Sequence, residues 1–99
     1  MNQEDFQSQA VRVFKALSDP TRYAMVRMLA SNGEVSCQTF QETFKLSPSA
    51  LSHHYRVLEN AGLTSTRRDR QYLFHELDTG TLHRFVPDFL ETHSAAASH

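Results

Sequence analysis

The sequence predicts a mainly α-helical domain with one β-hairpin near its C-terminal end. Over residues 5–60, apolar side chains recur at intervals of three and four residues, which is typical of helices with one buried face. Two runs rich in β-branched and aromatic residues follow at residues 63–68 and 71–77, and they favour two strands joined by a short turn at Asp69 and Arg70. The expected order is four helices, a hairpin and a last helix.

Start and stop signals divide the helical region. Asp19 and Ser47 are good N-cap residues, and each is followed by a proline, which fits the first turn of a helix because its missing N–H is not needed there. Pro87 lies inside the last helical pattern and should kink that helix or divide it in two. The expected helices cover residues 5–17, 20–32, 37–44, 48–60 and 79–93.

Length and composition indicate a single globular domain. The chain has 99 residues, of which 39% are apolar and 21% are charged, and this suffices for one modest core. We expect the domain to span residues 1–94 and residues 95–99 to form a frayed tail. No apolar run approaches the roughly 20 residues of a membrane-spanning helix, and the polar N-terminus is unlike a signal peptide. A cytoplasmic protein without a membrane partner is therefore expected.

The net charge of −1 conceals an uneven distribution of charge along the chain. Residues 47–72 carry four arginines against one glutamate and one aspartate, whereas residues 73–99 carry one arginine against four acidic side chains. A basic middle segment followed by an acidic end favours an anionic partner for residues 47–72.

The order of elements is that of a winged helix-turn-helix, in which two short helices and a following hairpin form a DNA-reading unit. In the helix over residues 48–60, Leu51, Tyr55 and Leu58 share the side that is expected to pack inward. The opposite side and the hairpin carry hydroxyl, imidazole and guanidinium groups, which hydrogen-bond with base edges or phosphates of duplex DNA. The candidate DNA-binding residues are Ser47, Ser49, Ser52, His53 and Arg56 on the helix and Thr66, Arg67, Arg68 and Arg70 at the hairpin tip.

Other interpretations of the same pattern stay open at this point. A polar outer face is common on surface helices, and an arginine-rich hairpin also keeps an exposed strand edge soluble. A winged helix that binds only protein partners fits the pattern as well. An enzyme is not expected, because Cys37 and the histidines have no supporting catalytic motif and no glycine-rich phosphate loop is present.

The chain carries three further motifs, which are SDPTR at residues 18–22, LSPSALSHH at residues 46–54 and VLENAGL at residues 57–63. In their order and spacing they resemble the motifs of the arsenic-repressor-type (ArsR/SmtB) family of transcriptional regulators. The resemblance covers residues 14–77 and implies a winged-helix homodimer that represses an operon by binding a two-fold operator, usually until an effector releases it. The family often has a glycine at the turn of the wing, where this chain has Arg70.

Apolar faces near both ends of the chain support the same expectation of a homodimer. Once the middle helices and the hairpin are packed, a domain of this size has little interior left for the first and last helices. Pairing these faces with a second copy would give a two-fold interface. The candidate dimerisation residues are Phe6, Ala10, Val13, Phe14, Leu82, Phe85 and Phe89.

The resemblance implies two places for a metal effector, and the sequence matches neither of them. The family's paired thiolates fall on Ser36 and Gln38, with Cys37 between them, and a thiolate site needs at least two soft ligands. Near the C-terminus, threonines occupy positions of the family's ligands, and we expect no metal or other cofactor. The weak candidates for a metal site there are His75, Asp78, His83 and His93.

Cys37 is the remaining candidate for an effector site. A position near a helix N-terminus can lower the pKa of a thiol and favour its reaction with oxidants or electrophiles. A lone cysteine more often packs as a small apolar residue, and this one has no resolving partner in the chain. A redox-responsive repressor is therefore one alternative, and the others are an effector that the sequence does not reveal and a protein without an effector.

Overall fold

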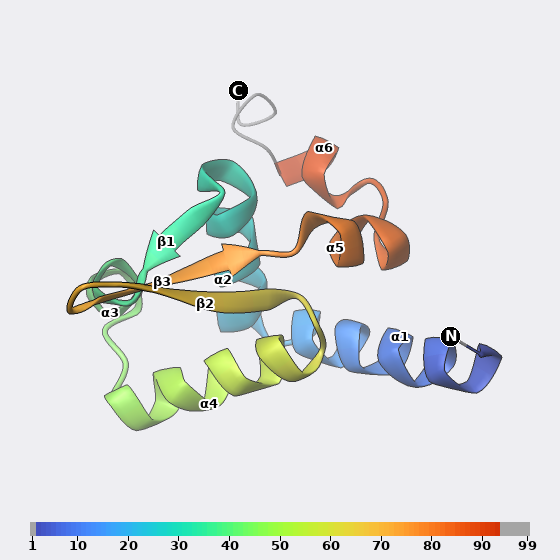
Figure 1. The fold of residues 1–99 in the computed structure, drawn as a ribbon, viewed down its shortest axis with the longest axis horizontal. Helices are drawn as coiled ribbons and strands as arrows, with labels where there is room; N and C mark the ends of the chain where they lie inside the picture. Colours follow the sequence, from blue (N-terminus) through green and yellow to red (C-terminus); the bar gives the residue numbers. More distant parts are fainter. Residues whose placement is uncertain (1, 94–99) are drawn as a thin grey trace.

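The computed structural model describes residues 2–93, the side chain of His93 excepted, so the predicted tail at residues 95–99 lies outside the described residues. Helices surround one face of a small antiparallel sheet (Figure 1). The elements are α1 (Gln3–Leu17), α2 (Pro20–Asn32), β1 (Glu34–Ser36), α3 (Cys37–Phe44), α4 (Pro48–Asn60), β2 (Thr64–Asp69), β3 (Tyr72–Leu77), α5 (Thr79–Phe85) and α6 (Phe89–His93). The expected fold class, mainly helical with a wing, is confirmed.

Side-chain caps explain why the helices begin where they do. At each of five starts, a side-chain oxygen accepts a hydrogen bond from the backbone N–H three residues further on, which satisfies one of the free donors of the first turn. The capping residues are Asn2, Asp19, Ser36, Ser47 and Asp78. The predicted bounds of α2, α3 and α4 are confirmed, because cap and proline signals are local.

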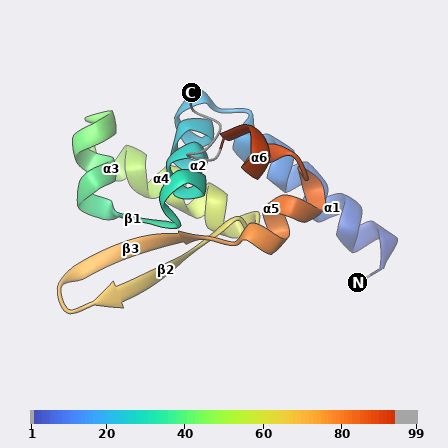
Figure 2. The same cartoon turned by 90° about the horizontal axis from the view of Figure 1, so that it is seen from above.

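The sheet has one strand more than the sequence indicated. Its order is β1-β3-β2, with both pairs antiparallel, so β3 is central and β1 lies beside it. Strand β1 has only three residues, too few to show a period of two, and this is why the sequence did not reveal it. Figure 2 shows the β2–β3 hairpin, the wing, projecting beyond the helices.

The turn of the wing lies one residue later than expected. Asp69 pairs with Tyr72 in the ladder, so Arg70 and Gln71 form the turn, and the predicted turn at Asp69 and Arg70 is wrong by one position. Arg70 has a φ of 59°, in the left-handed region that glycine adopts most easily. The arginine therefore takes a conformation that a glycine would adopt more easily.

The core lies between the helices and the inner face of the sheet. Met25, Val26 and Leu29 of α2 are at most 1% exposed, and Phe40 of α3 is 1% exposed. Helix α4 contributes two further core residues, which are Leu51 and Leu58. Helix α4 is thereby fixed on its apolar side, as the spacing of its leucines predicted.

The C-terminal helix is divided in two at Pro87 and not merely kinked there, which is one of the two outcomes expected from the sequence. Helix α5 ends at Phe85 and α6 begins at Phe89, with Val86 leaving the helical region at φ −138°. Within residues 2–93, no helix is both long and apolar enough to cross a membrane.

Candidate nucleic-acid interface

Helix α4 presents a polar stripe to solvent. Its apolar side is fixed in the core, and Ser47 closes the N-terminal end by accepting a hydrogen bond from the Ala50 amide at 3.1 Å. Since residues three, four and seven apart share one side of a helix, the exposed groups form a single surface. The exposed polar residues on it are Ser49, Ser52, His53 and Arg56.

The alternation of side chains along β2 sorts the wing residues onto two faces. Thr66 pairs with His75 and Arg68 pairs with Leu73, so these four share the inner face, towards α3 and α4. The Thr66 hydroxyl donates to a carboxylate oxygen of Glu59 on α4 at 3.4 Å. Arg68 is exposed on this side and Arg70 is exposed at the turn. Both remain candidates for contacts with phosphates.

Arg67 lies elsewhere than the sequence indicated. It is not at the tip but two residues before the end of β2, opposite Phe74 and on the outer face of the sheet. Its guanidinium Nη2 is 2.9 Å from a carboxylate oxygen of Glu34, and its Nε is 3.1 Å from one of Glu76. The predicted direct contact of Arg67 with DNA does not fit this position, because the carboxylates of Glu34 and Glu76 compete with a phosphate for its guanidinium.

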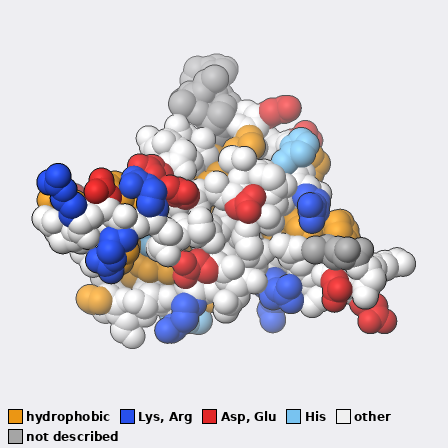
Figure 3. Space-filling view, viewed as in Figure 1, with side chains coloured by type: hydrophobic (Ala, Val, Ile, Leu, Met, Phe, Trp, Pro, Cys, Tyr) orange, Lys and Arg blue, Asp and Glu red, His pale blue; other side chains and the backbone are white. Residues whose placement is uncertain are grey.

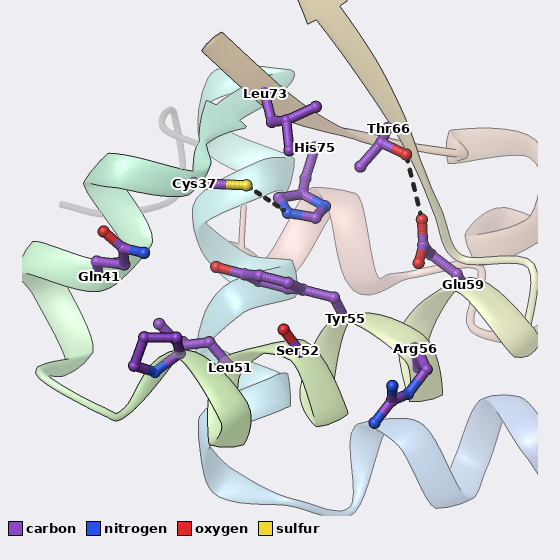
Figure 4. Close-up of a pocket in the computed structure, with 11 residues that line it drawn as sticks. Cys37, Gln41, Leu51, Ser52, Tyr55, Arg56, Glu59, Thr66, Leu73 and His75 are labelled. Carbon is purple, nitrogen blue, oxygen red and sulfur yellow. Dashed lines mark hydrogen bonds between the residues drawn. The ribbon is translucent and has the colours of Figure 1, made fainter. Parts of the chain in front are cut away.

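A hollow of about 450 Å³ separates α4 from the wing (Figure 4). Ser52 and Arg56 border it on α4, and Thr66 and Leu73 border it on the wing. Ser52 and Arg56 of the stripe and the inner face of the wing thus border one groove, a shape that suits a recognition helix with a flanking wing. His53 borders a separate hollow between α4 and α1.

Cys37, Tyr55 and His75 meet at the bottom of this hollow. The Cys37 Sγ atom is 3.1 Å from Nε2 of His75, and the rings of Tyr55 and His75 lie with centroids 4.0 Å apart. His75 is only 3% exposed, and the Tyr55 hydroxyl points towards Cys37 but makes no hydrogen bond of good geometry (Figure 4). The sequence did not bring these three together, because they lie on three separate elements.

Burial shifts the pKa of each of these three groups in the direction that favours its uncharged form. It lowers the pKa of His75 to about 4 and raises the pKa of Tyr55. Burial also raises the pKa of the Cys37 thiol, with a further rise from Glu59 and an opposing effect of Tyr55. The pKa of the thiol at the start of α3 is therefore raised and not lowered as expected, because loss of hydration is the largest effect on it.

The weak metal candidates are dispersed, and two already have other partners. His75 is hydrogen-bonded to Cys37, and the Asp78 carboxylate caps α5 by accepting from the Thr81 amide at 3.0 Å. His83 is exposed on α5, and His93 ends α6. In the part of the chain that the structure describes, no three His, Cys, Asp or Glu side chains lie close enough to hold a metal ion.

A second polar cluster ties α4 to the helices that precede it. The Arg22 guanidinium donates to the carbonyl of Ala16 at 2.9 Å and to that of Lys15 at 3.3 Å, and its Nη1 atom is 3.2 Å from Nδ1 of His54. Asp19 caps α2 and is 3.9 Å from His54. The SDPTR and LSPSALSHH motifs contain all the charged groups of this cluster, but their spacing could not show that they meet.

The predicted dimerisation residues fall into two groups. Three of them are core residues of the single chain and present no surface to a second copy, which corrects their assignment to an interface: Val13, Leu82 and Phe89. Phe6 and Phe14 are 43% and 55% exposed. Ala10 and Phe85 are half-buried, and the ring of Phe6 lies 4.9 Å from that of Phe85. An apolar surface along α1 and α5 therefore remains.

Known proteins share this chain's sequence and fold. A family model described as a helix-turn-helix domain matches residues 17–67. The HTH-type transcriptional regulator YceK of Bacillus subtilis is 40% identical over 93 residues, which cover 93% of this chain and 92% of that protein. The SmtB homologue of Synechocystis, named a transcriptional repressor, is 31% identical over 90 residues, covering 88% and 67%. The structure of HlyU from Vibrio cholerae matches with a TM-score of 0.69 and 31% identity, over 88% of this chain and 99% of HlyU.

The matched segment of residues 17–67 contains α2, α3, α4 and most of β2, and so includes the α3, α4 and β2 residues that line the groove, but not those of β3. The relatives match a larger share of the chain, 93% for YceK and 88% for HlyU. Motifs, fold and similarity agree, and the chain belongs to the ArsR/SmtB family of winged helix-turn-helix transcriptional regulators.

Proposed function

We propose that the protein is a repressor that binds a near-palindromic DNA duplex as a homodimer, with α4 in the major groove and the wing along the phosphate backbone. The observation that carries this proposal is the exposed polar stripe on a helix whose other side is fixed in the core. Such a helix keeps its orientation when it enters the groove, because its packing and its caps are complete before DNA is bound. We assign the protein no catalytic role.

The stripe offers groups suited to base edges. Ser52 and His53 can donate or accept hydrogen bonds, and Arg56 can reach a guanine or a phosphate. Ser47 and Ser49 stand at the helix N-terminus, where free backbone N–H groups and the helix dipole favour a phosphate. Thr66, Arg68 and Arg70 would follow the backbone beside the groove.

The second copy would cover the apolar surface of α1 and α5. Phe6 and Phe14 are exposed there, and a two-fold axis through this surface would present two α4 helices to one duplex. Successive major grooves on one side of DNA are roughly 34 Å apart, which sets the spacing expected of the two half-sites. Repression, and not activation, is proposed because the SmtB homologue of Synechocystis is named a transcriptional repressor.

The proposal is tested by footprinting the purified protein on the DNA upstream of its own gene, with and without metal ions and oxidants. A protected site with two-fold symmetry is expected, together with a dimer in analytical ultracentrifugation. If each subunit neutralises about four phosphates, log affinity should fall with log salt at a slope near −7. A slope near zero, or a monomer that protects no DNA, would refute the proposal. Release by one of the additives would identify the effector class.

A further inference from the structure

We propose that Arg67 is a positioning residue of the wing: it clamps β2 to β1 across the whole sheet and thereby sets the distance between the wing and α4. The inference rests on the DNA-binding function proposed above, but it assigns this arginine a role other than phosphate contact. It follows from contacts that span three strands.

The clamp joins the two outer strands of the sheet. Because the strand order is β1-β3-β2, Arg67 on β2 must reach across β3 to meet Glu34 on β1. Its Nη2 and Nε atoms contact the two carboxylate oxygens of Glu34 at 2.9 and 3.3 Å, and Nε is also 3.1 Å from Glu76 on β3. A planar guanidinium that grips a carboxylate at two points holds direction as well as distance.

The ring of Phe74 completes this arrangement. The guanidinium carbon of Arg67 lies 4.7 Å from the centroid of the Phe74 ring, directly across the ladder. Stacking on the ring restrains the long side chain between β2 and β3. The hydrogen bond with Glu34 is also the main cause of a raised pKa for Arg67, so the cation is favoured further.

The guanidinium of Arg67 also reduces a charge repulsion that the register of β1 and β3 creates. Glu34 and Glu76 are directly paired across β1 and β3, and like charges at such a position destabilise a sheet. Arg67 lies between them and neutralises one of the two charges. Figure 3 shows acidic and basic side chains next to one another over β1 and β3.

The outer face of the sheet is unsuited to a phosphate. Glu34, Glu76 and Asp69 share it with Arg67 by register, so three negative charges oppose one positive charge there. Arg68 lies on the inner face and makes no ion pair within residues 2–93. The two neighbouring arginines therefore differ in role: Arg68 is free to meet DNA, and Arg67 holds the wing.

The clamp acts on the DNA-reading unit because β1 leads directly into it. Ser36, the last residue of β1, is the N-cap of α3, so the wing is tied to the start of the helix-turn-helix. Loss of the clamp would let the wing move relative to α4. Binding would then be weaker because the wing must be ordered at the moment of binding.

The test compares R67Q with R68Q, which removes the same charge from the next residue. The probe is a 30-base-pair duplex selected from a random pool by the wild-type protein, titrated over a series of KCl concentrations. R67Q should weaken binding about fivefold without changing the salt slope, since every phosphate keeps its cationic partner. R68Q should reduce the magnitude of the slope by about 0.9 for each phosphate that is no longer neutralised.

A charge exchange provides the rescue. R67E should bind weakly, and R67E/E34R, whose formal charge equals that of the wild type, should restore the affinity because the pair is re-formed in reverse. A drop in the slope for R67Q like that for R68Q, or a double variant as weak as R67E, would overturn the clamp.

Hydrogen exchange without DNA separates the clamp from the proposed function. The amides of β2 should exchange about threefold faster in R67Q than in the wild type, and at the wild-type rate in R68Q. Equal rates in all three proteins would also overturn the clamp. A wild-type protein that selects no duplex would refute DNA binding, and the exchange rates would still decide whether Arg67 holds the wing.

Discussion

The Nη1 atom of Arg22 lies 3.2 Å from the Nδ1 atom of His54, and this contact joins the start of α2 to the middle of α4. A guanidinium can only donate, so Nδ1 of His54 must accept and the ring is neutral, with its proton on Nε2. Burial lowers the pKa of His54. The positive charge of Arg22 and the neighbouring His53 lower this pKa further, whereas the carboxylate of Asp19 raises it. Arg22 also holds the last carbonyls of α1, so one side chain aligns three helices.

Replacing Arg22 by lysine should destabilise the fold. A lysine ammonium cannot serve the Ala16 and Lys15 carbonyls and the His54 ring together, so the end of α1 loses its cap. We expect R22K to lower the free energy of unfolding by about 2 kcal/mol in urea titrations. R27K, an exposed substitution on the same helix, is the control. An equal effect of both variants would contradict this role.

Acid should destabilise the protein through His75. The unfolded side chain titrates near 6.5, whereas burial holds the folded pKa at about 4. Between these values the unfolded state binds more protons, so stability is complete above pH 6.5 and falls as the pH decreases towards 4, by about 3 kcal/mol from this group. Urea midpoints measured over this interval should fall less in H75Q than in the wild type. H83Q, which alters an exposed histidine, should follow the wild type; an unchanged profile for H75Q would contradict the prediction.

Removing the hydroxyl of Tyr55 should not cost stability. Its oxygen is buried and makes no hydrogen bond of good geometry within the described residues, so the phenol loses hydration on folding and gains little in exchange. We expect Y55F to raise the free energy of unfolding by up to about 1 kcal/mol. Y72F, at an exposed position, should change nothing. Destabilisation by Y55F would show that the hydroxyl has a partner in solution.

Base-reading and backbone contacts should respond differently to substitution. S52A and H53A should reduce the ratio of specific to non-specific affinity, with a cost of about 1–3 kcal/mol at the contacted base pair. R68A should weaken binding to all duplexes to a similar degree. Competition titrations against matched and scrambled duplexes measure both effects. If the two groups lose specificity equally, the assignment of base-reading roles fails.

The Cys37 thiol should react slowly while the protein is folded. Its pKa is raised by burial, so little thiolate is present at pH 7, and thiolate is the reactive form. Alkylation by iodoacetamide should be several-fold slower in buffer than in 8 M urea, as followed by mass spectrometry. Alkylation at least as fast in the folded protein would favour the redox-responsive alternative.

The features that could be predicted from the sequence are those that depend on residues close together in the chain. Caps and prolines at Asp19 and Ser47 set the starts of α2 and α4, because a cap acts on its own turn. Periodicity identified the buried leucines and the exposed stripe of α4, because a helix fixes which residues share a side. These signals sufficed for the winged helix-turn-helix, and the resemblance of three sequence motifs indicated its family.

What only the tertiary structure decided depends on the register of the sheet and on burial. Arg67 and Arg68 are neighbours with the same side chain, and no local signal distinguishes them; pairing with Phe74 and Leu73 puts them on opposite faces. Val13, Leu82 and Phe89 belong to the core rather than to an interface, and their burial depends on elements distant in the chain. The environment of Cys37 depends likewise on His75, 38 residues away, since hydration is lost only when separate segments meet.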